Sequence, residues 1–592
     1  MELSAVCLLG KLYKEKIIKE LGDDYTNIFV ENPNDTGNYN TVLEIVIDKD
    51  FNYVETRVSE FKSEYIPKYL YKKKAPNGPD FTPTARITKP EKTLSNKIIA
   101  SFKETIKDYE ETHDVAFLKN ILNTLVSNQK TILEDIKNKF DSKKGSILTV
   151  VYDNKYMGDI EIFRDKLKKD AVKNYYLIDG KESRRQKKVC SICKEKNKEV
   201  YGNANVFKFY TVDKEGYVAG GFKKLDSWRN FPVCPDCAIE LELGKRYLDE
   251  NLSFKFQGRD FYLIPKLVFE KDLPIVLNRL QKLKGEILEN TYETVEESIF
   301  RRLQTLENYV SFDLLFYEEN QSALNIKLSV QEVLPSRFRK LYEGLTNINT
   351  LMRDCPASQK LRIDFRYLNA LFPIKTHNRY FLEVVDIILS DKRIDYKFII
   401  SHITNHIIES FNEEDGRFFY HETIKSYGFL MYLRLLNVLF KERGQVGKME
   451  KFYWDIKDYG SKEELFEDFF KENMDFFSSP DKKAVFLIGL LTQKLLNVQM
   501  AKEERAPFVN RLKGLKLGQK DIKRLLPEIQ NKFTEYDAQY YRDIQALASS
   551  YLIKAGEKWT ITDLDIPFYF SLGMNLERHI NLSNKEEVKD ND

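Results

Sequence analysis

Hydrophobic and polar residues change their pattern once along the chain, near Pro335. Before that residue, several segments alternate apolar and polar residues or are rich in β-branched residues, which is typical of strands. Four such segments are residues 41–50, 145–153, 252–269 and 309–333. Residues 96–140 have helical spacing and predict one broken helix or two successive helices. From about Pro335 onward a helical period takes over, so the pattern predicts an α+β fold: a mixed N-terminal α/β region followed by an all-α C-terminal helical bundle.

The same pattern predicts two hairpins and a division of the chain. Residues 252–269 are expected to turn at Gly258–Asp260, and residues 309–333 at Glu319–Gln321. The last boundary is placed at Met474, because Ser478 or Ser479 can cap a following helix with Pro480 in its first turn. Five parts result: an N-terminal α+β domain (1–180), a cysteine-containing module with an inserted hairpin (181–245), a continuation of the α+β region (246–334), a helical domain (335–473) and a C-terminal helical bundle (474–592).

Composition and hydropathy exclude two classes of protein. Of the 592 residues, 42% are hydrophobic and 13% aromatic, which excludes a disordered chain. The most apolar stretch, residues 484–500, is interrupted by Thr492, Gln493 and Lys494 and predicts a buried helix rather than a membrane span. Residues 1–16 lack the pattern of a signal peptide. With six cysteines, too few for a disulfide scaffold, we expect a cytoplasmic protein with reduced thiols and no membrane contact.

Four of the six cysteines form two C-x2-C pairs. Cys190 and Cys193 are separated by 40 residues from Cys234 and Cys237. Two residues between cysteines let both thiolates point into one tetrahedral site, and two such pairs supply four soft ligands and leave no open position. The spacing predicts a structural Zn²⁺ site, and residues 206–222 between the pairs predict an inserted hairpin whose base the metal holds. The alternatives are four unrelated free cysteines or a redox pair.

The net charge is only +3, but positive charge is concentrated in three segments. Residues 61–100 contain 9 Lys or Arg against 3 Asp or Glu, residues 181–230 contain 13 against 6, and residues 502–532 contain 9 against 4. Such concentrations suit phosphate contacts with nucleic acid; the alternative is a solvated surface without a partner. The candidate nucleic-acid-binding residues are Lys68, Lys72, Lys73, Lys74, Asn77, Arg86, Lys89, Arg184, Arg185, Lys187, Lys188, Arg505, Arg511, Lys513, Lys516 and Lys520.

The sequence lacks the common motifs of catalysis. It has no phosphate-binding loop and no Gly-Gly-Asp-Asp motif, and the adjacent pair His113-Asp114 is expected in a charged helix without the partner histidines of a metal phosphohydrolase. His402 and His406 share one helical face, but the carboxylate pattern of a zinc protease is missing. Tyr420 and His421 have no nucleophile beside them. The sequence therefore predicts a protein that is not an enzyme.

Three stretches resemble a known family. They are "VCSICKEKNKEVYGN" with "FPVCPDCAIELELGKRYL", "GLLTQKLLNVQMAKEERAPFVNRLKGLKLGQKDIKRLLPEIQNKFTEYD" and "FYFSLGMNL". Their order is similar to that of the CRISPR-associated large subunit of type I-B Cascade complexes, in which a cysteine-pair module lies between an N-terminal region and a helical C-terminal domain. The four cysteines match the family's cysteine module. The resemblance also implies an internal translation start, for which the sequence offers Met474, giving a separate small subunit.

The resemblance implies a non-catalytic subunit that recognises the protospacer-adjacent motif in duplex DNA and contacts the 5′ handle of the crRNA. It also implies that the subunit stabilises the R-loop and licenses recruitment of a helicase-nuclease. The implied partners are crRNA, target double-stranded DNA, its displaced strand, and the backbone, crRNA-processing and small subunits of Cascade. Two alternatives stay open: a zinc-containing CRISPR enzyme, either a nuclease or a polymerase-like large subunit, and a zinc-held scaffold that binds no nucleic acid.

Overall fold

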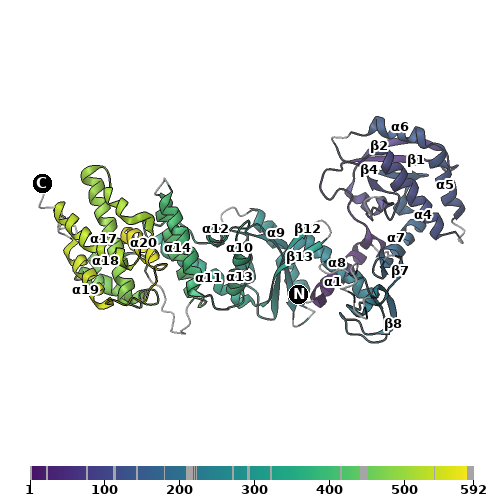
Figure 1. Cartoon of the computed structure of the whole chain (residues 1–592). Helices are drawn as coiled ribbons and strands as arrows, with labels where there is room; N and C mark the ends of the chain where they lie inside the picture. The colour runs from purple at the N-terminus through teal and green to yellow at the C-terminus, as the bar shows by residue number, and fades with distance from the viewer. Residues whose placement is uncertain are drawn as a thin grey trace. The chain divides into compact units, whose positions relative to one another are not determined.

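The chain forms two compact units (Figure 1). The N-terminal unit comprises Glu2–Asn251 and Glu319–Asn325, and the C-terminal unit comprises Leu252–Glu318 and Ile326–Asp592. The five-part division made from the sequence stays a prediction. The computed structural model describes residues 3–21, 25–74, 78–110, 115–141, 144–178, 180–208, 212, 218, 221, 223–267, 269, 272–289, 294–320, 323–413, 417–439, 451–538 and 541–582.

A mixed sheet forms the centre of the N-terminal unit. Its strand order is β2-β1-β4-β3, and β5 pairs with β4. β1 and β4 lie parallel, with Thr41 opposite Ser146, while β2 runs antiparallel to β1. Apart from their ends, both central strands are almost wholly buried, as their β-branched residues predict. The bounds are β1 Thr41–Ile47, β2 Tyr53–Glu60, β3 Ala85–Arg86, β4 Ser146–Tyr152 and β5 Lys155–Tyr156.

Helices between β1 and β4 supply most of the core on one face of this sheet. Leu43 and Ile45 of β1 belong to the same buried cluster as Phe102, Leu118 and Ile132 from three helices. The helical stretch predicted from the sequence is therefore correct in type, but it forms three α-helices in the described residues rather than one or two. They are α4 Ala100–Asp108, α5 Val115–Ser127 and α6 Gln129–Lys139.

The first helix of the chain packs against the helix that carries two of the predicted metal ligands. These are α1 (Leu3–Leu21) and α8 (Pro235–Asn251). A Cβ atom on Gly10 would lie 1.7 Å from the backbone oxygen of Glu240, and one on Gly244 would lie 2.0 Å from the oxygen of Val6. Both glycines are thus required for a crossing in which the two backbones touch.

A four-stranded antiparallel sheet begins the C-terminal unit, in the order β10-β11-β12-β13. The hairpin predicted at residues 252–269 is confirmed, but its turn is not at Gly258–Asp260. Gln257 and Gly258 form it, with φ of 47° and 80°, and Arg259 already begins the next strand. β12 extends to Asn320, whereas Gln321, part of the other predicted turn, lies outside the described residues. The strands are β10 Ser253–Phe256, β11 Arg259–Leu267, β12 Val310–Asn320 and β13 Ala323–Val333.

Helices dominate the rest of the C-terminal unit, as the periodicity from Pro335 predicts. The one sheet described after β13 is the two-residue pair β14–β15 (Trp454–Asp455 with Ile580–Asn581). The predicted fold class, a mixed α/β region followed by a largely helical region, is therefore confirmed. The helices are α9 Leu273–Glu289, α10 Val295–Leu303, α11 Pro335–Asp354, α12 Phe365–Leu371, α13 Asn378–Leu389, α14 Tyr396–Asn412, α15 Arg417–Leu435, α16 Lys462–Glu472, α17 Pro480–Glu503, α18 Gln519–Glu535, α19 Arg542–Ala555 and α20 Ile566–Leu576.

The apolar helix α17 is the centre of the C-terminal bundle. It is the one helix among the described residues that is long and apolar enough to cross a membrane, and 67% of its apolar window is buried inside the protein. α19 and α20 pack along it, and Figure 1 shows α17 to α20 gathered at the C-terminal end of the chain. Ser479 has the N-cap position and Pro480 is the first residue, as predicted, but the side chain of Ser479 makes no capping hydrogen bond. The core helix of a helical bundle can be equally long and apolar, because neighbouring helices bury its side chains.

The helix before Met474, α16, packs against the same C-terminal bundle. Phe469 of α16 stacks on Phe486 of α17 with ring centroids 4.9 Å apart, and Phe470 contacts Tyr551 of α19 at 5.7 Å. These aromatic residues therefore pack on the helices of the bundle. Met474 itself is 63% exposed in the turn between α16 and α17. A fragment starting there would lack the helix that covers Phe486.

Candidate metal centre

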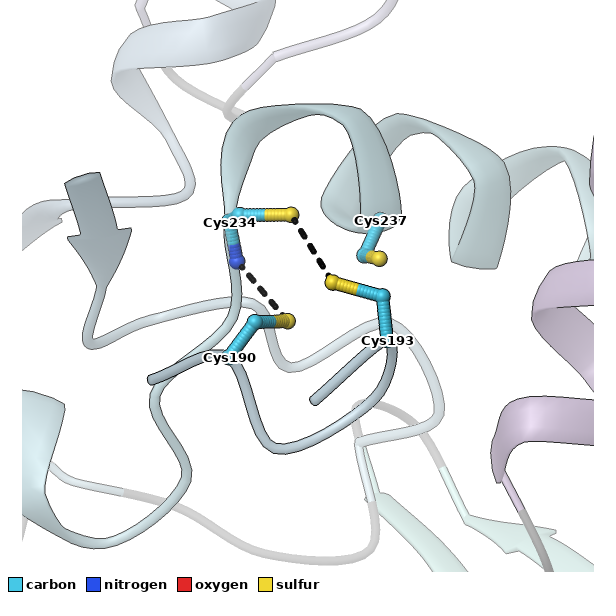
Figure 2. Close-up of side chains that lie close together, drawn as sticks. All are labelled: Cys190, Cys193, Cys234 and Cys237. Carbon is cyan, nitrogen blue, oxygen red and sulfur yellow. Dashed lines mark hydrogen bonds between the residues drawn. The ribbon is translucent and has the colours of Figure 1, made fainter. Parts of the chain in front are cut away.

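The four cysteines predicted as ligands lie together at the start of α8. The Sγ atoms of Cys190, Cys193, Cys234 and Cys237 all lie within 4.8 Å of one another, and those of Cys193 and Cys234 are 3.9 Å apart (Figure 2). Four sulfurs at about 2.3 Å from a tetrahedral ion would be about 3.8 Å from each other. Three of the cysteines are buried and Cys193 is exposed. The arrangement is compatible with a closed site for one metal ion.

Backbone geometry explains why these cysteines converge. The first pair is part of a tight loop in which the amide of Lys194 donates to the carbonyl of Cys190 at 3.1 Å. Lys194 has a φ of 62°, the left-handed conformation that reverses the chain after Cys193. Cys234 and Cys237 are placed by the first turn of α8, in which the amide of Ala238 donates to the carbonyl of Cys234 at 2.9 Å. Backbone amides of Ile192 and Cys234 donate to Sγ of Cys190 at 3.4 and 3.3 Å.

Electrostatics within the cluster favour a bound cation. Hydrogen bonds from the thiols of Cys234 and Cys237 lower the pKa of Cys190 far below its usual value. The same hydrogen bonds to Cys190 raise the pKa of Cys234 and of Cys237, because each of these thiols is held in its protonated form. One thiolate therefore forms readily and further thiolates are opposed by its charge. A divalent cation removes that repulsion and lets all four sulfurs bind as thiolates.

The two cysteine pairs are joined by strands outside the cluster. β8 (Arg184–Lys188) leads into the first pair and runs antiparallel to β9 (Lys198–Tyr201), which follows it. Tyr201 then bridges Val233, the residue before Cys234. The sequence did not predict either strand. The inserted hairpin predicted at residues 206–222 falls mainly on positions outside the described residues.

A fifth cysteine lies beside the cluster, and sequence reasoning missed it. Cys7 of α1 donates to Oε2 of Glu240 at 3.1 Å, and these two residues form a second group with Cys237 in which the ligand atoms lie within 4.8 Å of one another. Nothing in the spacing of Cys7 relates it to a residue 230 positions away. The signal that could have identified it is the pair of glycines, Gly10 and Gly244, whose backbones allow the two helices to touch.

Two predicted nucleic-acid-binding residues of the first basic segment, Lys72 and Arg86, form ion pairs with carboxylates of the protein itself. Nζ of Lys72, with its side chain 13% exposed, lies 3.2 Å from Glu31 and 3.1 Å from Glu242. These carboxylates raise the pKa of Lys72, opposing its desolvation, so its ammonium is charged and paired. Arg86 pairs with Asp35 at 2.6 Å and donates to the backbone oxygen of Pro33.

The other residues of this segment lie nearer the surface. Lys68 lies 4.6 Å from the ring centroid of Tyr65, and Lys74 pairs with Glu104 at 2.7 Å. Lys73 and Lys89 are exposed. Asn77 lies outside the described residues.

Lys72 also lines a cavity of about 920 Å³ in the N-terminal unit. The surrounding charges are four cations and six carboxylates, so the cavity is net acidic. They come from Lys72, Lys208, Lys245 and Arg246 and from Glu31, Asp35, Glu242, Asp249, Glu250 and Glu319. An excess of carboxylates disfavours a phosphate ligand.

The second basic segment is an exposed strand next to the cysteines. All five residues of β8 are exposed. Arg184 pairs with Glu182 and lies over the ring of Tyr176, while Lys188 lies 5.3 Å from the ring centroid of Trp228. The two remaining cations, Arg185 and Lys187, project from the same strand. A row of positive charge therefore lies beside the cysteine cluster.

The third basic segment runs from the end of α17 into α18, and Lys520 lies in the first turn of α18. All five predicted residues there are exposed, and three contact carboxylates: Arg505 with Glu503, Arg511 with Glu528, and Lys513 with Asp521. Such exposed pairs are weak and are exchanged easily for phosphate. The remaining two predicted residues are Lys516 and Lys520.

Comparison with protein families gives one consistent result. Three family models match the chain in order, and each is described as one domain of CRISPR-associated protein TM1802 (cas_TM1802). The N-terminal domain matches residues 3–169, the central domain residues 187–333 and the C-terminal domain residues 363–588. The central match contains all four clustered cysteines. No curated protein matches the chain.

Proposed function

Because this chain belongs to the CRISPR-associated TM1802 family, we propose that it is the non-catalytic large subunit of a crRNA-guided type I-B interference complex in the cytoplasm. The observation that carries the proposal is the match of all three domains of that family, in order, over nearly the whole chain. A CRISPR-associated protein works with nucleic acid and with other CRISPR proteins. The basic surfaces described above supply the chemistry for the first of these interactions.

The metal in this proposal is Zn²⁺ with a structural role. Four thiolates complete a tetrahedral sphere and leave no position for water or substrate, so the ion would hold the loop of Cys190 and the start of α8 together. Its function is then to fix the position of β8 relative to α8. Arg185, Lys187 and Lys188 would be presented as a rigid row rather than on a mobile loop.

The proposed partners are the crRNA, target duplex DNA with its displaced strand, and the backbone, crRNA-processing and small subunits of Cascade. In this role the chain recognises the protospacer-adjacent motif as duplex, contacts the 5′ handle of the crRNA and stabilises the R-loop. The rest of the target sequence is recognised by base pairing with the guide RNA. The protein then contacts the nucleic-acid backbone and the protospacer-adjacent motif. Cleavage belongs to a separate helicase-nuclease that the bound complex recruits.

A salt-dependent gel shift tests the proposal. The chain is co-expressed with its partner subunits and a crRNA, and the assembled complex is titrated with labelled duplex DNA that carries the matching sequence. Changing Arg185, Lys187 and Lys188 to Ala should weaken binding and reduce the slope of log Kd against log salt by about 0.9 for each lost phosphate contact. The charge-matched control changes Lys103, Lys107 and Lys130, which are exposed on helices of the same unit, and should leave affinity and slope unchanged.

Two results would contradict the proposal. One is an assembled complex with no affinity for target DNA at any salt concentration. The other is hydrolysis of DNA, RNA or ATP that co-purifies with the chain and disappears when a single Asp, Glu or His is substituted.

A further inference from the structure

A second pocket, in the C-terminal unit, has the opposite charge balance to the cavity around Lys72. It has a volume of about 420 Å³ and is formed by one side of α11 and by the turn that follows this helix. Three cations line it, Arg353, Lys360 and Arg362, against a single carboxylate, that of Glu297. None of these residues stands out in the sequence.

The single carboxylate is already used by the fold. Glu297 is 3% exposed and accepts a hydrogen bond from the backbone amide of Thr294 at 3.0 Å, as part of the capping box of α10. Its Oε2 also pairs with Arg362 at 2.6 Å. In the part of the chain that the structure describes, neither Arg353 nor Lys360 forms an ion pair, and both side chains are exposed. The pocket therefore carries two positive charges without a protein counter-ion.

The walls of the pocket are fixed before any ligand arrives. The side-chain amide of Asn349 donates to the backbone oxygen of Ile363 at 2.9 Å and accepts from its amide at 2.7 Å, which fastens the segment after the turn to α11. Ser358, fully buried, donates to the backbone oxygen of Met352 at 2.8 Å and fixes the turn itself. Lys360 thus projects from an anchored turn, and preorganisation of this kind reduces the entropy that binding costs.

We propose that this pocket binds a phosphate group of single-stranded nucleic acid. The proposal rests on the proposed function, because the strand would be the displaced strand or an unpaired part of the guide. A phosphodiester is an anion with several acceptor oxygens, which matches a guanidinium and an ammonium that face one recess. A single strand can turn one phosphate and its sugar into a recess of this size, whereas a duplex holds its phosphates on a stiff, wide surface.

The experiment measures binding of a fluorescent 12-nucleotide DNA strand to the full chain. The test variant combines Arg353→Ala with Lys360→Ala, and its charge-matched control combines Lys375→Ala with Lys397→Ala, two exposed lysines of the same unit. The test variant should bind at least about 5-fold more weakly, and its salt slope should fall by about 0.7 for each lost contact, or about 1.4 for two. The control should match the unmodified chain, and circular dichroism verifies that both variants are folded.

A free phosphorylated molecule is the other source of the same chemistry, and inorganic phosphate and AMP are the probes for it. At equal ionic strength, neither should displace the strand better than chloride does. If the test variant loses affinity for phosphate or AMP but keeps its affinity for the strand, the pocket serves a small molecule and the proposal is wrong. If strand affinity and slope are unchanged, the proposal is also wrong while the proposed function stands. If the unmodified chain binds no strand and its assembled complex binds no target DNA, both are overturned.

Discussion

Sγ of Cys355 lies 3.3 Å from Nδ1 of His579, a contact that joins the end of α11 to the last described segment of the chain. The imidazole is fully buried, with the Tyr420 hydroxyl 3.0 Å from Nε2 and the backbone oxygen of Phe452 3.1 Å from Nδ1. Nδ1–H donates to Phe452, so Nε2 is left to accept from Tyr420. A neutral ring satisfies both contacts, and burial disfavours the charged form.

The first prediction concerns acid stability. Burial lowers the pKa of His579 from 6.5 to about 4. A histidine with a lowered pKa takes up its proton more readily when the chain is unfolded, so its contribution is fully present above pH 6.5 and is lost progressively as pH falls from 6.5 to 4. The loss is about 3 kcal/mol. Urea unfolding between pH 7.5 and 4 should show this decrease, and His579→Asn, which keeps a donor for Phe452, should lower overall stability but flatten the pH dependence.

Carboxylates also contribute to acid unfolding, so the comparison of the two proteins is the decisive measurement. Equal pH dependence in the unmodified chain and in His579→Asn would contradict the assignment of a neutral buried ring.

The second prediction concerns the metal. Cys237→Ser should reduce bound zinc from about one equivalent per chain to less than about a third, because three thiolates with a hydroxyl bind it much more weakly. Since metal affinity at such sites is folding free energy, the variant should lose stability on the order of several kcal/mol. Elemental analysis and thermal unfolding measure the two effects.

Cys7→Ser provides the matched control. Its thiol lies beside Cys237 but donates to Glu240, so the variant should keep its metal. Loss of zinc from Cys7→Ser would show that Cys7 is a ligand and that four cysteines do not complete the site.

The third prediction concerns the contact of α1 with α8. Gly10→Ala would place a methyl group 1.7 Å from the backbone oxygen of Glu240, so the helices must separate. We expect a destabilisation of about 1–3 kcal/mol or more, measured by thermal or urea unfolding of the full chain. Gly78→Ala is the control, because no atom lies within 4 Å of its new Cβ, and its stability should change by less than about 0.5 kcal/mol.

The fourth prediction concerns the C-terminal bundle. A fragment of residues 474–592 should be less stable and bind more of a hydrophobic dye than one of residues 451–592, because only the longer fragment keeps Phe469 and Phe470 over α17. Removing one buried phenylalanine costs about 3–5 kcal/mol. Equal melting temperatures for the two fragments would contradict this and would restore Met474 as a natural boundary of the bundle.

The sequence was informative wherever the deciding residues are close together along the chain. The two cysteine pairs, the strands around Leu43 and Leu148, and the helix that starts at Pro480 all follow from local spacing, and the structure has them where they were predicted. Their physical causes are ligand geometry, the spacing of β-branched residues and the fixed φ of Pro480 at the start of a helix, and each acts over a few residues.

Contacts between distant residues could not be predicted in this way. The sequence around Lys72 predicts an unpaired positive charge. In the structure Lys72 pairs with Glu31, 41 positions earlier, and with Glu242, 170 positions later. The phosphate pocket was missed for the same reason, since it requires Glu297, on a different helix, to be matched with Arg362. Local charge counts cannot distinguish a paired cation from one that awaits a ligand.

The packing of α1 on α8 cannot form until late in the synthesis of the chain. α1 ends at Leu21 and α8 begins at Pro235, so a ribosome must add more than 200 residues before the first helix meets its partner. At about 5–20 residues per second this takes roughly 10 to 40 s. Cys234 and Cys237 emerge with the same segment, so assembly of the four-cysteine cluster and docking of α1 become possible at nearly the same moment of synthesis. Until then the face of α1 that packs on α8 stays uncovered, and a chaperone could protect it during this interval.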